Sequence, residues 1–114
     1  MPSPMRIELE LMRGAGPAAV MQLLESGEKY GYELVQLLEK RSNGVLAMGQ
    51  STLYPMLYNL QAKGLIAARS ETAESGRTRK YYRLTDKGKR QLAKDRKQWE
   101  SLSAAMGQLG VIGA

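Results

Sequence analysis

The sequence predicts a mainly α-helical domain with one small β-hairpin and a long C-terminal helix, and three observations support this prediction. Apolar residues recur at helical spacing in three segments before residue 64. Two short β-compatible segments then flank a turn-rich loop, which is typical of a hairpin. Helical spacing returns after Thr85 and continues to about residue 106. At 114 residues, the chain is long enough for one such domain.

The first helix is expected over residues 17–26. Gly16 is the predicted N-cap and Pro17 the first helical residue, because the fixed φ and missing N–H of proline suit that position. Gly27 is expected to end the helix. A preceding helical segment over 4–13, joined to it with a kink at Pro17, is also compatible with the sequence.

The second helix is predicted over residues 30–41, because Leu34 and Leu38 repeat on one apolar face. Residues 42–44, Ser-Asn-Gly, are expected to end it. The short apolar segment 45–48 that follows is predicted to pair as a first strand.

The third helix is expected over residues 51–63, with Leu53 and Leu57 in its apolar stripe and Gly64 after its end. Pro55 is costly inside a helix, so the helix is predicted to begin only a few residues before it.

The hairpin is predicted from two strands, 65–71 and 79–84, on either side of the turn-rich residues 72–76. Successive strand residues point to opposite faces, so one of Tyr81 and Tyr82 is expected to pack on the core.

The last helix is predicted over 86–106, with Thr85 as its N-cap. The order helix, helix, helix, hairpin, helix is that of a winged helix-turn-helix with an extra C-terminal helix. We expect residues 1–85 to form the winged helix-turn-helix domain, with the hairpin over 65–84 as its wing. Residues 86–114 are expected to form a dimerisation helix and tail.

The composition excludes most catalytic chemistry. The chain contains no cysteine and no histidine, which removes disulfides, thiolate nucleophiles, imidazole bases and nearly every structural zinc site. No phosphate-binding glycine loop and no calcium-loop pattern occur in the sequence. We therefore expect no enzyme activity, no metal and no cofactor.

The net charge of +6 is unevenly distributed. Residues 1–62 hold five basic and six acidic side chains, whereas residues 63–114 hold twelve basic and five acidic ones. A concentrated positive field is typical of a protein that binds a polyanion. From charge alone, a solvated helix face and a charged hairpin explain the pattern equally well.

No apolar run approaches the ~20 residues that span a bilayer, and the N-terminal residues 1–12 include glutamates where a secretory signal is apolar. The expectation is a cytoplasmic protein without a membrane partner.

The third helix and the wing are the predicted double-stranded DNA interface. The second helix of a helix-turn-helix unit enters the major groove. In this sequence that helix is 51–63, which begins with short polar residues and contains no aspartate or glutamate. Basic residues at a hairpin tip grip phosphates. An ordinary amphipathic surface helix is the alternative, which the adjoining wing disfavours. The predicted DNA-binding residues are Gln50, Ser51, Thr52, Tyr54, Tyr58, Lys63, Arg77, Arg79 and Lys80.

The last helix carries an apolar seam with the spacing of a coiled coil, interrupted at Asp95. A terminal helix has little of its own domain left to cover, so the seam predicts a homodimer. Packing against the first helix of the same chain is a compatible alternative. The predicted interface residues are Leu92, Trp99, Leu102 and Met106.

Three motifs together resemble those of a known family. They are Tyr-Gly-Tyr-Glu-Leu at 30–34, Thr-Leu-Tyr-Pro at 52–55 and Arg-Lys-Tyr-Tyr-x-Leu-Thr at 79–85. Over about residues 20–105 the chain resembles the PadR family of bacterial transcriptional regulators. Two features depart from the family pattern. Ser51 stands where many members have glycine, and residues 14–17, Gly-Ala-Gly-Pro, stand where the family usually has a continuous apolar helix.

The resemblance implies a dimeric winged helix that is usually a repressor. The third helix would enter the major groove of an inverted-repeat operator and the wing the minor groove, while the terminal helices dimerise. It also implies that a small aromatic effector, bound near the dimer interface, releases the protein from its operator. Trp99 is the best candidate for the effector contact, although a seam aromatic is more often plain core. The alternative function is a winged-helix module that binds a protein or RNA partner without an effector.

Overall fold

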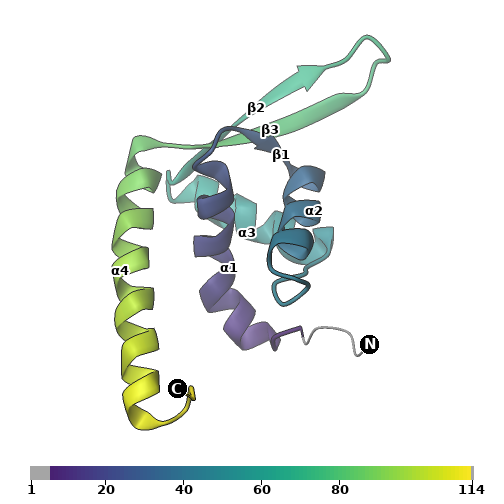
Figure 1. Ribbon diagram of the computed structural model, residues 1–114. Coiled ribbons are helices and arrows are strands. Elements are labelled where there is room, and N and C mark those ends of the chain that lie inside the picture. Colours follow the sequence, from purple (N-terminus) through teal and green to yellow (C-terminus); the bar gives the residue numbers. More distant parts are fainter. Residues whose placement is uncertain (1–5, 114) are drawn as a thin grey trace.

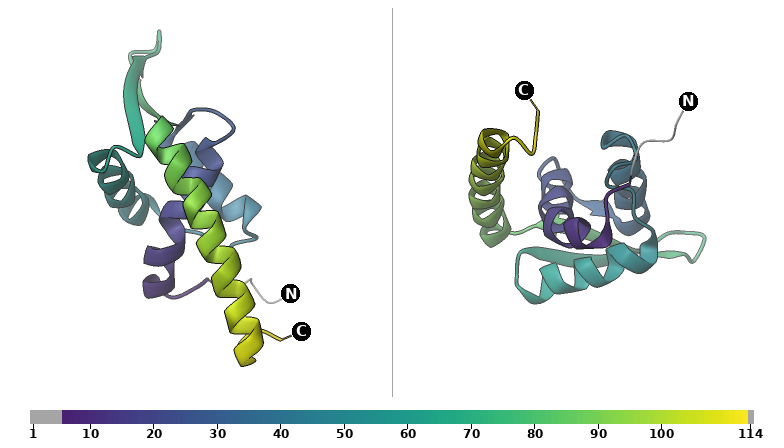
Figure 2. Two further views of the ribbon diagram at one scale, coloured as in Figure 1. Left: turned by 90° about the vertical axis from the view of Figure 1, so that its left-hand side faces the viewer. Right: turned by 90° about the horizontal axis from the view of Figure 1, so that it is seen from below.

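The computed structural model describes residues 6–113 (Figure 1). These residues form four helices and a small antiparallel sheet. The hairpin of β2 and β3 projects away from the helices, and α4 runs alongside α1 (Figure 2). No described helix is both long and apolar enough to cross a membrane. The elements are α1 (Leu9–Leu24), β1 (Lys29–Tyr30), α2 (Gly31–Arg41), α3 (Gln50–Ala62), β2 (Ile66–Thr72), β3 (Thr78–Leu84) and α4 (Asp86–Leu109).

The sheet has the strand order β1-β3-β2. Strands β2 and β3 pair from Ile66 opposite Leu84 to Thr72 opposite Thr78, so the predicted hairpin is confirmed. The third strand, β1, adds two residues to the other edge of β3 and directly precedes α2.

The strand predicted at 45–48 is wrong. These residues lie in turns and a loop after α2, and the Val45 carbonyl accepts a hydrogen bond from the Ile7 N–H at 3.3 Å. Asn43 and Gly44 both adopt positive φ, which turns the chain sharply. Within the segment, Met48 packs into the core, where it is 5% exposed, and Leu46 packs against the core, whereas Val45 is 37% exposed.

The predicted helix start at Gly16 is also wrong, because α1 begins at Leu9 and continues through Pro17 as one helix. Proline at this position costs one backbone hydrogen bond, that from residue 17 to the Arg13 carbonyl. Gly16 is buried against α3, where a Cβ would lie 2.5 Å from the Met56 Cε atom. The flexible end of the Met56 side chain thus occupies the space beside Gly16.

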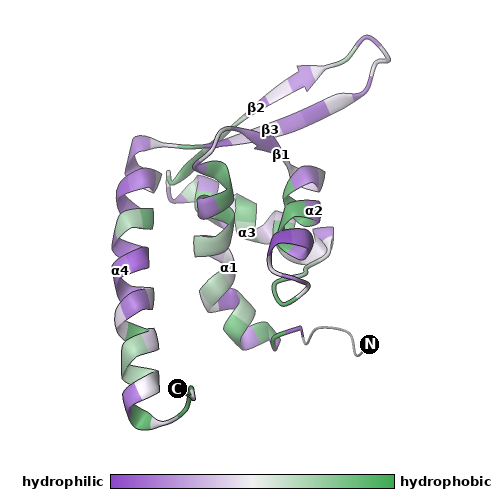
Figure 3. Cartoon of the chain, in the orientation of Figure 1, coloured by the Kyte–Doolittle hydropathy of each residue, from purple (hydrophilic) through white to green (hydrophobic). Residues whose placement is uncertain are grey.

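The core forms where α1, α2, α3 and the base of the hairpin meet, and hydrophobic residues (green) recur along these helices in Figure 3. Tyr82 is 4% exposed within it, while Tyr81 lies outside, as their alternation predicts. The most completely buried side chains are Val20, Met21, Leu34, Leu53, Leu57 and Ile66.

Helix α4 is anchored to the base of the wing, here the hairpin of β2 and β3. Thr85 is its N-cap, as predicted, and its hydroxyl accepts from the Gly88 N–H at 3.0 Å. The same hydroxyl donates to the Gly64 carbonyl at 2.7 Å. The Lys87 ammonium donates to the carbonyl of Lys63 at 2.8 Å. The end of α3 and the start of α4 are thereby tied together.

Two glutamate–arginine pairs tie the sequence-distant elements to one another. Arg96 on α4 contacts Glu25 after α1 at 2.8 Å, and Arg69 on β2 pairs with Glu28 before β1. Hydrogen bonding from its arginine lowers the pKa of each carboxyl below 4.5. Both pairs are exposed to solvent, so each contributes modestly to stability.

These pairs predict a pH dependence of the melting temperature. A carboxyl with a lowered folded pKa stabilises the fold above its unfolded value of 4.5, and this contribution is lost as the pH falls through the folded pKa. The melting temperature should therefore drop below about pH 5 and change little between about pH 6 and 8, since the chain has no histidine. A Glu25→Gln, Glu28→Gln double variant should show a shallower acid drop than the parent, and an equal drop would contradict the assignment.

Candidate nucleic-acid interface

The outward face of α3 is polar and free of carboxylates. Its apolar stripe is buried, with Leu53 at 0% and Leu57 at 1% exposure. On the other side, Tyr58 is 73% and Tyr54 40% exposed. The helix begins at Gln50, one residue before the predicted start, and contains no aspartate or glutamate. Among the described residues, this face therefore offers hydroxyl and amide groups without a fixed negative charge.

A wing-side groove lies between α3, the start of α2 and the wing, with a volume of about 500 Å³. It brings the predicted residue Tyr54 together with all three predicted wing cations. Its lining residues are Tyr30, Gly31, Tyr32, Tyr54, Arg77, Thr78, Arg79 and Lys80.

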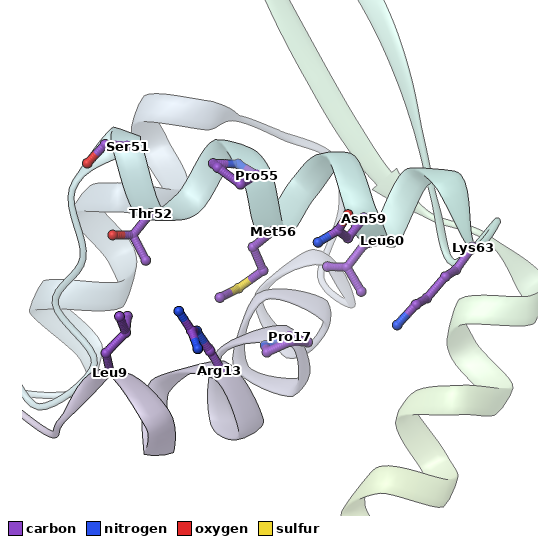
Figure 4. A pocket seen from close by; sticks show the side chains of 10 residues that line it. All are labelled: Leu9, Arg13, Pro17, Ser51, Thr52, Pro55, Met56, Asn59, Leu60 and Lys63. Atoms are coloured by element: carbon purple, nitrogen blue, oxygen red, sulfur yellow. The ribbon is translucent and has the colours of Figure 1, made fainter.

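An α1-side groove of about 530 Å³ lies on the other side of α3 (Figure 4). It brings together three further predicted residues, Ser51, Thr52 and Lys63. Gln50 and Tyr58 line neither groove. The lining residues of the α1-side groove are Leu9, Arg13, Pro17, Ser51, Thr52, Pro55, Met56, Asn59, Leu60 and Lys63.

The wing has a fixed base and an exposed tip. Near the base, Arg69 pairs with Glu28 and Glu71, which raises the pKa of its guanidinium, and lies 4.8 Å from the ring centroid of Tyr81. At the tip, residues 73–77 are exposed and Gly76 adopts a φ of +85°. The base is thus held by charge pairs, whereas the tip is available to a partner.

Arg79 is positioned by an aromatic neighbour. Its guanidinium lies 4.7 Å from the ring centroid of Tyr30, which itself packs edge-on against Tyr81 at 5.8 Å. Stacking on a ring face restricts the arginine without using its hydrogen-bond donors. Those donors stay available to an anion in the groove.

Sequence reasoning missed several lining residues of the two grooves, among them Tyr30, Gly31, Tyr32 and Arg13. The first three were interpreted as the start of a helix and as part of a family motif, and not as site residues. A Cβ at Gly31 would lie 2.5 Å from the Tyr54 hydroxyl oxygen, so glycine lets that ring rest against α2. The tyrosines beside a helix start were the available signal. Arg13 had none, because its place depends on how α1 crosses α3.

The predicted dimer seam divides along α4. Leu92 is 2% exposed and belongs to the chain's own core. Further along, Trp99 is 40% and Leu102 48% exposed, while Met106 is half-buried. The partner-facing role of these residues remains a prediction. Trp99 also lines a groove of about 330 Å³ between α1 and α4.

Comparison with known proteins gives one consistent result. The sequence profile of the "Transcriptional regulator PadR-like family" matches residues 20–94. The transcriptional regulator Rv3488 of Mycobacterium tuberculosis is 32% identical over 94 residues, which cover 82% of this chain and 84% of that protein. The negative transcriptional regulator PadR of Bacillus subtilis is 31% identical over 74 residues, covering 65% of this chain and 41% of that protein.

Solved structures resemble the fold closely. A PadR family transcriptional regulator from Eggerthella lenta has a TM-score of 0.78 and 37% identity, covering 89% of this chain and 86% of that one. A transcriptional regulator from Clostridium thermocellum has a TM-score of 0.81 at 24% identity, over 90% and 96% of the two chains. These likenesses confirm the predicted fold class.

Proposed function

The chain belongs to the PadR-like family of transcriptional regulators, and from that premise we propose that it is a repressor that binds an inverted-repeat operator as a homodimer. The family is one of regulators and not of enzymes, in agreement with the sequence. The observation that carries the proposal is a carboxylate-free α3 with cations in the grooves on both of its sides.

The proposed docking places α3 in the major groove and the wing tip in the minor groove. Exposed hydroxyl and amide groups on α3, such as those of Ser51 and Tyr58, suit base edges and phosphates. On the wing, Arg77 at the tip and Arg79 on β3 supply charges of the kind that phosphates and narrow minor grooves attract.

The dimer is proposed to form through the ends of α1 and α4. Leu11 on α1 is 63% exposed, and Leu102 and Leu109 on α4 are 48% and 77% exposed. Large apolar side chains left exposed on two neighbouring helices mark a surface that another chain covers. A two-fold dimer presents two copies of α3 and therefore requires a two-fold operator.

A small aromatic molecule is proposed as the effector, with Trp99 as its contact. The groove beside Trp99 lies between α1 and α4, which are also the proposed dimer helices. A ligand bound there would change the spacing of the two copies of α3, and DNA affinity would change with it.

The proposal is tested by selecting duplexes from a random pool with the full chain and measuring the mass of the complex. The expected result is a dimer on sites with two-fold symmetry, whose half-sites lie about one helical turn, or a multiple of it, apart. Equal affinity for selected and random duplexes at moderate salt would overturn it.

In a second arm, planar aromatic compounds that release DNA should also alter the fluorescence of Trp99. Release of DNA with unchanged fluorescence would overturn the effector contact.

A further inference from the structure

The α1-side groove contains a cation outside the predicted interface. Arg13 extends from α1 toward α3 between Leu9 and Pro17, and Lys63 lies in the same groove at the end of α3 (Figure 4). The hydroxyls of Ser51 and Thr52 and the amide of Asn59 also line it. None of the described lining residues is acidic.

The lack of an ion pair within the described residues sets Arg13 apart from the arginines that hold the fold together. Arg69 and Arg96 each pair with a glutamate from a distant part of the chain. Within residues 6–113, Arg13 and Lys63 form no ion pair through their side chains. Two cations without a counter-charge in one groove attract an anion from outside.

The two grooves lie on different sides of α3. Thr52 and Tyr54 are two residues apart, which is about 200° around a helix of 3.6 residues per turn. Thr52 lines the α1-side groove together with Lys63, whereas Tyr54 lines the wing-side groove. The cations of the wing and the cations of the α1-side groove are therefore separated by the width of the helix.

This arrangement matches the walls of a major groove. A helix in the major groove, about 12 Å wide, has one phosphate backbone on each side. If the wing-side cations face one backbone, the α1-side groove faces the other. Resting on the proposed function, we infer that Arg13 of α1, with Lys63, contacts a phosphate of the strand on the side of α3 away from the wing.

Helix α1 then takes part in both DNA binding and the proposed dimer. Its N-terminal half carries Arg13 toward the DNA, while Leu11, two residues earlier and about 200° around the helix, belongs to the proposed dimer surface. The floor of the groove is apolar at Pro17, Met56 and Leu60, which also suits a small amphiphilic anion. The lack of any carboxylate on α3 and the second set of cations across it favour the phosphate.

The test measures the affinity of full-length Arg13→Gln for a selected duplex and for a random one, each at several salt concentrations. Losing one phosphate contact per subunit should lower both affinities about tenfold at ~0.1 M salt and reduce the slope of log K against log salt by about 1.8 for a dimer. Arg13→Lys keeps the charge and should restore most of the slope. Arg41→Gln removes an exposed arginine that lines neither groove and should change nothing.

Ethylation interference locates the contact. In the parent, ethylating a phosphate on the strand away from the wing should block binding, and in Arg13→Gln that phosphate should no longer matter. An unchanged salt slope and an unchanged interference pattern in Arg13→Gln would overturn the inference, and this is also what a small-molecule site predicts in ligand-free buffer. If the parent itself shows no duplex binding, the proposed function fails instead.

Discussion

Replacing Arg77, Arg79 and Lys80 together with alanine is expected to lower the affinity for operator DNA at least about a thousandfold at ~0.1 M salt. The three side chains line one groove, so the proposed dimer loses up to six phosphate contacts. The slope of log K against log salt should fall by about 5. Random duplexes should lose affinity as well, because phosphate contacts carry little sequence information.

A matched control separates local contact from overall charge. The triple variant Arg90→Ala, Lys94→Ala, Lys97→Ala removes the same three charges from exposed positions on α4. It should retain most of the affinity. Equal losses of DNA affinity in the two triple variants would show that the wing cations act only through the positive electrostatic field of the whole protein. Circular dichroism should confirm that both variants keep the helical content of the parent.

The second large effect is expected from Gly88→Ala, which should lower the free energy of unfolding by about 3 kcal/mol. A Cβ at Gly88 would lie 2.0 Å from the carbonyl oxygen of Leu65 and 2.8 Å from a methyl of Leu84. The first of these atoms is backbone, so the clash is relieved only if α4 moves away from the base of the wing. Urea denaturation followed by circular dichroism measures the change.

Gly107→Ala is the matched control, because it makes the same substitution in the same helix. A Cβ there meets nothing within 4 Å among the described residues of the chain. Alanine has the higher helix propensity, so this variant should gain up to about 1 kcal/mol. If Gly88→Ala proved as stable as Gly107→Ala, the close contact at Leu65 would not constrain the fold.

Local patterns predicted the elements whose signals lie within a few residues of one another. Thr85 as an N-cap and the alternation of Tyr81 and Tyr82 are examples. The prediction failed where distant packing overrode a local rule. Pro17 sits inside α1 because burial of that helix outweighs the lost hydrogen bond. Residues 45–48 form no strand, and of them Met48 is buried in the core while Val45 stays exposed.

The candidate site follows the same division. The residue types at the wing tip and on α3 were recognisable from the sequence, since charge and polarity are local properties. Their separation into two grooves was not, because it depends on the crossing of α1 with α3 and of the wing with α2. Arg13 therefore gave no signal, and Tyr30 gave none for its stacking under Arg79.

The contact between Gly31 and the ring of Tyr54 constrains how the sequence drifts over time. A larger residue at position 31 would collide with the tyrosine, whose hydroxyl would be 2.5 Å from the new Cβ. Such a change is tolerated when position 54 has already become smaller. The two positions are 23 apart in the chain, yet they should covary among descendants of this gene. Lineages in which position 54 shrinks before position 31 grows are then favoured.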